Sequence, residues 1–244
     1  MNKIAIVSDI HGNILALQEV IKDIESRNVD QVVNLGDHIS GPLWPKETLE
    51  LLKSLDWIHI LGNHDRQLFE QKPGTHNPSD SYAYQFLDKN DLEWLSSLPD
   101  VHHVGNDFTF FHGTPLNDSV YLLETVENGM TRLANMNEIK ERLGKTNCAI
   151  ISCGHSHIPR VVRIQDMLII NPGSVGLQAY DDVSPEYHKI EVGSPHARYA
   201  ILERQNDNWF TEIIAVPHDN NKAADQALKN DRKDWEKGLR TGFM

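Results

Sequence analysis

Short apolar runs recur along the chain, and several of them end abruptly in polar residues. The clearest run covers 57–61 and stops at Gly-Asn-His-Asp, residues 62–65. Comparable runs cover 4–7, 32–35, 108–111, 149–151 and 167–170. Runs of this length, rich in β-branched residues, are typical of buried strands. The apolar spacing between the first runs predicts a helix over 14–26 and another that begins near Pro45.

Strands and helices therefore alternate over the first part of the chain, which predicts a parallel sheet with right-handed crossovers. Two short helices are expected farther along, at 82–88 and 91–97. The runs 198–204 and 209–216 flank Asn-Asp-Asn and predict an antiparallel hairpin.

Two other segments have helical patterns. Residues 116–145 have mixed periodicity that predicts helical pieces, the best of them at 137–143. Residues 222–239 predict a charged C-terminal helix. We therefore expect one domain over 1–244, in which 116–145 forms a helical cover.

Composition narrows the class of protein. Lys and Arg number 23 and Asp and Glu 35, so the formal net charge is −12. An acidic chain repels polyanions, which argues against nucleic acid polymers and membranes as partners. No apolar stretch approaches the ~18 residues of a transmembrane helix, and the start Met1-Asn2-Lys3 does not resemble a signal peptide. Cys148 and Cys153 would lie about 16 Å apart along a strand, too far for a disulfide, which predicts a reduced, cytoplasmic protein.

Polar side chains able to bind metal follow the predicted strands. They are Asp9, His11, Asp37, Asn63, His64, His112, His155 and His157. Because strands of one sheet bring their carboxyl ends to one edge, we expect these side chains to converge. Carboxylate, amide and imidazole groups without thiolate suit Mn²⁺, Fe²⁺ and Zn²⁺. The set is too large for one tetrahedral ion and suits two ions that share a carboxylate, the usual arrangement for phosphoryl hydrolysis.

The order Asp-x-His, Gly-Asp, Gly-Asn-His-Asp, His and Gly-His-x-His over residues 9–157 resembles the calcineurin-like metallophosphoesterase superfamily. Asn-Pro-Gly-Ser at 171–174 extends the resemblance to its small bacterial and archaeal phosphodiesterases, and in outline to relatives of diadenosine tetraphosphatase. The late position of His-x-His argues against an amidohydrolase barrel, and the His-x-His-x-Asp-His of β-lactamase-like hydrolases is absent. The resemblance implies an α/β fold, a four-layer αββα sandwich.

The resemblance also implies roles by position. Asp9, His11 and His157 would bind a first metal, Asn63, His112 and His155 a second, and Asp37 would bridge them. His64 would face the phosphoryl group or the leaving oxygen as the catalytic residue. The implied cofactors are two divalent metal ions, such as Mn²⁺, Fe²⁺ or Fe³⁺, Zn²⁺ or Ni²⁺. His38, Arg66 and Asp65 stand beside these positions; Asp65 is expected to hold the loop, while Arg66 would either hold it or bind substrate phosphate.

The implied activity is metal-dependent hydrolysis of a small phosphodiester. Water or hydroxide between the metals would attack, and His64 would stabilise the transition state or protonate the leaving alkoxide. A phosphomonoesterase, a protein phosphatase or a dinucleoside-polyphosphate hydrolase are alternatives of the same class. A non-catalytic scaffold of the same fold, as in the retromer subunit, is an alternative of another class. It is disfavoured because every motif residue is present.

Overall fold

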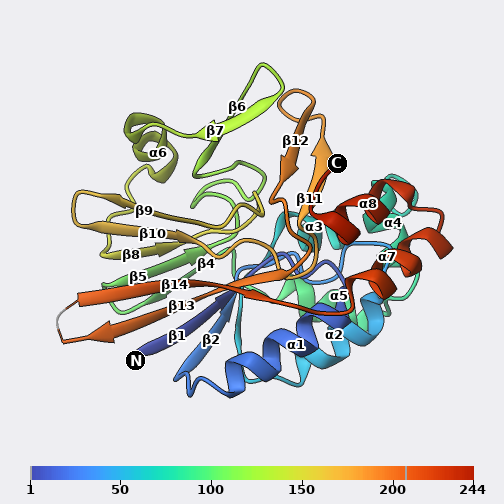
Figure 1. Cartoon of the computed structure of the whole chain (residues 1–244), viewed down its shortest axis with the longest axis horizontal. Coiled ribbons are helices and arrows are strands. Elements are labelled where there is room, and N and C mark those ends of the chain that lie inside the picture. Colours follow the sequence, from blue (N-terminus) through green and yellow to red (C-terminus); the bar gives the residue numbers. More distant parts are fainter. Residues whose placement is uncertain (1, 207) are drawn as a thin grey trace.

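The computed structural model describes residues 2–206 and 208–244, so Met1 and the turn residue at 207 of the expected hairpin lie outside it. Two five-stranded sheets lie face to face (Figure 1). In spatial order the first sheet contains β14 (Asn208–Val216), β13 (Ala197–Gln205), β1 (Lys3–Val7), β2 (Gln31–Asn34) and β3 (Ile58–His59). The second contains β4 (Val101–Val104), β5 (Phe108–Phe111), β8 (Ile150–Ser152), β10 (Met167–Asn171) and β9 (Arg160–Ile164).

The central strands of each sheet are parallel and end level with one another. Val7 pairs with Asn34, and Asn34 pairs with His59, so β1, β2 and β3 end together. In the second sheet, Phe110 and Ile170 both pair with Ser152. The loops that follow these strands therefore leave from a common edge of each sheet.

Helices α1 (Ile14–Glu25) and α2 (Pro45–Lys53) pack on the outer face of the first sheet, and α6 (Met136–Leu143) packs on that of the second. The other helices are α3 (Asn63–Glu70), α4 (Pro78–Tyr84), α5 (Lys89–Ser96), α7 (Asn220–Lys229) and α8 (Lys233–Thr241), which pack in two further cores. Two small hairpins complete the chain: β6 (Glu124–Glu127) with β7 (Met130–Leu133), and β11 (Ala179–Asp182) with β12 (His188–Glu191).

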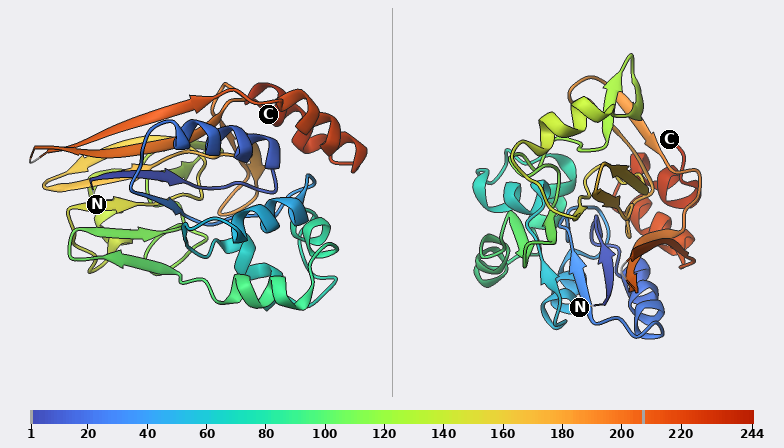
Figure 2. Two further views of the ribbon diagram at one scale, coloured as in Figure 1. Left: turned by 90° about the horizontal axis from the view of Figure 1, so that it is seen from below. Right: turned by 90° about the vertical axis from the view of Figure 1, so that its left-hand side faces the viewer.

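Alternation along β1 shows how the layers form. Ile4 and Ile6 pack in the core between the two sheets, whereas Ala5 and Val7 pack in a second core with α1. A third core joins the outer face of the second sheet to α6 through Ile139 and Leu143. The order of the layers is therefore helix, sheet, sheet, helix. It can be seen in the right-hand view of Figure 2, between α6 and α1. This arrangement confirms the expected αββα fold.

Some elements differ from the sequence expectation. The run 57–61 forms a strand only at Ile58–His59, although Ile60 and Leu61 are still buried in the loop before α3. The helices expected at 82–88 and 91–97 begin earlier, at Pro78 and Lys89, because Asn77 and Asp88 cap their first turns.

The two segments with helical patterns also differ from expectation. Residues 116–145 contain the β6–β7 hairpin, and their one helix is α6, close to the expected 137–143. The helix expected at 222–239 is instead the pair α7 and α8, which breaks around Asn230. Both cysteines are free. Within the described residues, no helix combines the length and the apolar character needed to cross a membrane.

Candidate metal centre

The loops at the strand ends hold an unusual backbone conformation. Ten non-glycine residues in the described ranges have a positive φ, and half of them are candidate ligands. These are Asp9 (56°), His11 (51°), Asp37 (55°), His155 (67°) and His157 (57°). Side chains other than glycine occupy this region at an energetic cost, and such residues concentrate at functional sites. The loops therefore hold these five side chains in place at the expense of local strain.

Glycines let these loops pack closely against each other. A Cβ on Gly62 would lie 2.2 Å from Asp37 Oδ1, and a Cβ on Gly154 would lie 2.0 Å from Ser8 Oγ. Neither position has room for a side chain. The glycines of Gly-Asn-His-Asp and Gly-His-Ser-His are therefore required by the approach of the Asp37 and Asp9 loops.

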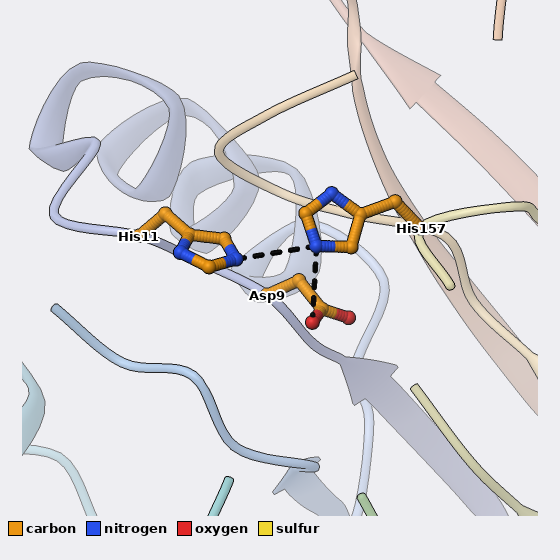
Figure 3. Close-up of side chains that lie close together, drawn as sticks. All are labelled: Asp9, His11 and His157. Atoms are coloured by element: carbon orange, nitrogen blue, oxygen red, sulfur yellow. Dashed lines mark hydrogen bonds and ion pairs between the residues drawn. The ribbon is translucent and has the colours of Figure 1, made fainter. Parts of the chain in front are cut away.

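A first group of donors consists of Asp9, His11 and His157 (Figure 3). His157 Nε2 lies 3.2 Å from His11 Nε2 and 3.3 Å from Asp9 Oδ1. The Nδ1 atoms of His11 and His157 each lie 2.7 Å from a backbone carbonyl oxygen, that of Ser40 and that of Leu177. Because a carbonyl only accepts, each Nδ1 carries the hydrogen, and in the neutral rings both Nε2 atoms present lone pairs. The two lone pairs and a carboxylate oxygen thus converge on one point.

A second group consists of Asp37, His112 and His155. His112 Nε2 lies 3.3 Å from Asp37 Oδ2 and 3.0 Å from Asn63 Oδ1, and His112 Nδ1 donates to the Leu35 carbonyl at 2.9 Å. Asp37 Oδ2 also lies 3.8 Å from His11 Nε2 in the first group. All seven candidate ligands are therefore brought together, with Asp37 between the two groups. Their binding of metal stays a prediction.

The electrostatics of the two groups fit divalent cations. Asp9 and Asp37 are buried, and Asp9 Oδ1 accepts no hydrogen bond from any described residue. Burial raises the pKa of both carboxyl groups, but neighbouring imidazoles outweigh it, lowering that of Asp9 to about 2 and that of Asp37 well below its ordinary value. Burial lowers the pKa of His11 to about 4. Ionised, buried carboxylates form a donor set that requires positive charge nearby.

His64 has a different environment from the candidate ligands. It lies in the first turn of α3, and its Nδ1 is 2.8 Å from Oδ1 of the fully buried Asp80. Ser40 Oγ donates to the same Asp80 oxygen. Burial lowers the pKa of His64, but the charges of Asp37 and Asp80 raise it to about 9. Sequence reasoning missed Asp80, since the only signal nearby is the helix start at Asn77-Pro78, which indicates no partner for His64.

Asp65 and His38, which stand beside the candidate ligands, hold the loops that carry them. Asp65 accepts hydrogen bonds from the backbone N–H groups of Asp37 (2.9 Å), His38 (3.0 Å) and Gly62 (3.0 Å), and pairs with His38 Nδ1 at 2.7 Å. His38 is buried and faces the interior. Asp65 therefore fixes the loop that carries Asp37, as expected.

The guanidinium of Arg66 is already paired with two carboxylates. Its Nε and one Nη donate to Asp118 at 2.6 and 2.9 Å, and its other Nη donates to Glu70 at 2.7 Å. The pair with Asp118 joins α3 to the loop after β5, and the pair with Glu70 lies within α3. The geometry favours the loop-holding alternative for Arg66.

The Asn-Pro-Gly-Ser motif supports both halves of the centre. Asn171 Nδ2 donates to the Gly154 carbonyl at 2.8 Å, in the loop that carries His155 and His157. Ser174 Oγ donates to the Asp9 carbonyl at 2.7 Å. This motif thus connects the loops that carry Asp9 and His157, which explains its place in the pattern.

The two groups open into a cavity of about 850 Å³. Its walls come from the segment after β5, from the β11–β12 hairpin, and from α4 and α8. Tyr121, Tyr180, Ser79, Arg232 and Trp235 are among the lining residues. Trp44 packs in the core beside α7 and α8 and does not line the cavity. A pocket of this size accepts a ligand of nucleotide dimensions.

Comparisons with known proteins agree with the fold. Residues 2–194 match the model of the calcineurin-like phosphoesterase superfamily domain. The chain is 27% identical over 247 residues to uncharacterized protein MJ0912 of Methanocaldococcus jannaschii, covering 95% of this chain and 94% of that protein.

Two solved structures share the fold along almost the whole chain. A metallophosphoesterase from Sphaerobacter thermophilus has a TM-score of 0.75 at 24% identity, and covers 99% of each chain. Hypothetical protein PH1004 from Pyrococcus horikoshii OT3 has a TM-score of 0.76 at 18% identity, with the same coverage. At these identities the likeness shows the fold alone. Because the family model matches most of the chain, the chain belongs to the calcineurin-like phosphoesterase superfamily, a family of divalent-metal-dependent hydrolases of phosphoric esters.

Proposed function

We propose that the protein hydrolyses a small phosphodiester at a dinuclear metal centre. Asp9, His11 and His157 would hold one ion, Asn63, His112 and His155 the other, and Asp37 would bridge them. The observation that carries the proposal is the position of Asp37 Oδ2, 3.3 Å from His112 Nε2 and 3.8 Å from His11 Nε2. When bound, divalent ions such as Mn²⁺, Fe²⁺, Zn²⁺ or Ni²⁺ supply positive charge that neutralises phosphate oxygens and activates water.

The chain's own residues orient the groups and hold the proton for the reaction. The backbone N–H of His64 donates to Asp37 Oδ1 at 3.0 Å, which fixes that carboxylate against the start of α3. Asp80 accepts from His64 Nδ1, so Nε2 is the nitrogen left to donate a proton to the leaving oxygen. The raised pKa of His64, about 9, keeps that proton available at neutral pH.

Shape and charge favour small substrates. The cavity is bounded by Val120, Tyr121 and Glu124 from the 116–145 segment, and its lining also includes Asp181, Asp182 and Asp234. Carboxylates in the cavity lining repel a long polyanion, and the net charge of −12 acts in the same direction. We therefore expect nucleic acid polymers to be poor substrates.

Metal analysis of two variants tests the bridging assignment. Asp37→Ala should lose both metals because the carboxylate would touch both, whereas Asp9→Ala should chiefly weaken one. Asp118→Asn is the matched control, because it disturbs the neighbouring loop through Arg66 without removing a candidate ligand. If Asp37→Ala keeps two tightly bound metals, the assignment is wrong. A panel of diesters, monoesters and dinucleoside polyphosphates on the metal-loaded protein would decide between the diester and the other esters.

A further inference from the structure

The C-terminal helix borders the end of the cavity at which His64 lies. Arg232, directly before α8, donates from Nη1 to Ser79 Oγ at 3.0 Å, and Ser79 precedes the Asp80 that holds His64. Trp235, in the first turn of α8, lies edge-on to His11 with ring centroids 5.9 Å apart. Trp235 therefore lies beside His11, whose ring is 5.6 Å from that of His64, and Arg232 lines the same cavity from the Ser79 side.

Both side chains are fixed by their surroundings. The Arg232 guanidinium lies 5.5 Å from the centre of the Trp235 ring, and its side chain is only 16% exposed. It pairs with Asp234 through Nε at 2.9 Å and through Nη2 at 2.6 Å. Trp235 is 7% exposed and packs in the core formed with α7. Little conformational entropy would be lost if these groups contacted a ligand.

Hydrogen-bond donors remain available at this wall. A guanidinium has five N–H groups, and Asp234 and Ser79 take up three of those on Arg232. The indole Nε1 of Trp235 donates to none of the residues in the described ranges, and it is not among their fully buried polar atoms. Because Asp234 already neutralises the Arg232 charge, the wall suits a neutral group with acceptor atoms better than a second anion.

We propose that Arg232 and Trp235 form a leaving-group subsite that binds a planar organic group carrying acceptor atoms, as a nucleobase or a nitroaryl group does. The subsite rests on the proposed function, because the leaving group is the part of the substrate that must lie next to His64. The family model ends at residue 194, so both residues lie outside the matched segment. The leaving-group preference is thus a property of this chain's C-terminal part.

Equilibrium binding of three phosphonates to the Mn²⁺-loaded protein tests the subsite. Methylphosphonate, benzylphosphonate and 4-nitrobenzylphosphonate share a head group that cannot be hydrolysed, and differ in the organic group. Titration calorimetry should show the nitrobenzyl compound binding roughly tenfold more tightly than the benzyl compound, as expected for hydrogen bonds from fixed donors. Arg232→Gln should remove most of this preference and leave methylphosphonate affinity unchanged. Asp234→Asn should retain or increase it.

Two further variants keep the test decisive. Trp235→Phe preserves the packing but removes the N–H, and should lower the preference even if Arg232→Gln folds poorly. Arg240→Gln is the control, because Arg240 lies on the same helix and pairs with Asp225 outside the cavity. Equal binding of the two aromatic phosphonates by the unmodified protein, or an unchanged preference in Arg232→Gln, would overturn the subsite. Hydrolysis of bis(4-nitrophenyl) phosphate is measured separately: its absence counts against the proposed function, while the binding ratio still decides the subsite.

Discussion

Histidines in this site differ in what holds their Nδ1 atoms. His11, His112 and His157 donate from Nδ1 to main-chain carbonyls, which fixes each ring and turns its Nε2 toward the carboxylates. His64 instead pairs with the Asp80 carboxylate, which favours the charged ring. The partner of Nδ1 therefore distinguishes two kinds of histidine: a carbonyl partner suits a metal ligand, and a carboxylate partner suits a proton donor.

This difference predicts how Asp80 affects the reaction. Asp80→Asn should keep normal metal content and lower turnover by roughly 10–100-fold, because the proton on His64 is no longer stabilised. His64→Ala should cost roughly 10²–10⁴. Both losses should shrink for a 4-nitrophenolate leaving group, which barely needs a proton.

Asp91→Asn is the control for these variants. Asp91 is buried like Asp80, but it pairs with Lys46 and Lys53 and does not line the cavity. If Asp80→Asn loses metal, or lowers turnover equally for good and poor leaving groups, then Asp80 has a structural role and does not position the acid.

Strands that are buried on both faces could be predicted from the sequence, whereas β4 and β9, at the two edges of the second sheet, could not. β1, β5 and β10 appear as unbroken apolar runs because the core covers both of their faces. β9, in contrast, carries Arg160 and Arg163 at the edge of its sheet, so no unbroken apolar run marks it. α3 begins at Asn63 in a stretch that reads as polar. The candidate ligands could be placed because they follow the buried strands, but the contact of Asp80 with His64 depends on packing between helices.

Shortening the β6–β7 hairpin tests whether the 116–145 segment covers the cavity and narrows it toward small substrates. Thr125 and Val126 line the cavity, whereas Ile139 and Leu143 of α6 pack on the second sheet and must be spared. Glu124 pairs with Leu133, so an Asn-Gly turn can replace residues 125–132 without changing the register. We expect unchanged metal content and a higher ratio of activity on bulky esters to activity on small ones.

Met130→Ser is the control for the shortened hairpin, because Met130 is exposed and does not line the cavity. An unchanged ratio in a folded, metal-loaded protein would mean that the hairpin only shields the edge of the sheet.

Across the whole molecule, segments distant in sequence complete one site. β13 and β14 extend the first sheet beside β1, and α7 and α8 then return to the cavity near His11 (Figure 1). The sequence shows a charged helical pattern at 222–239, but nothing local indicates which surface it covers. Packing two sheets with their carboxyl edges together also buries Asp9 and Asp37 in an acidic protein, so the stability of the fold depends on what neutralises them.

This dependence predicts how the metal-free protein responds to pH. Burial opposes protonation of His112, but the adjacent Asp37 raises its pKa to about 10 from an ordinary 6.5. A raised pKa in the folded state adds stability that is complete below pH 6.5 and is lost as pH rises toward 10. Bound cations would replace this proton, so the metal-loaded protein should not lose that stability.

Thermal unfolding with Mn²⁺ and with a chelator should therefore show a gap in melting temperature that widens from pH 6.5 to pH 9. In His112→Asn, the metal-free protein should lose part of this pH dependence, since one titrating group is gone while His64, whose pKa is raised to about 9, remains. A metal-free protein whose stability is constant or rises over this range would contradict the assignment of the positive charge to His112.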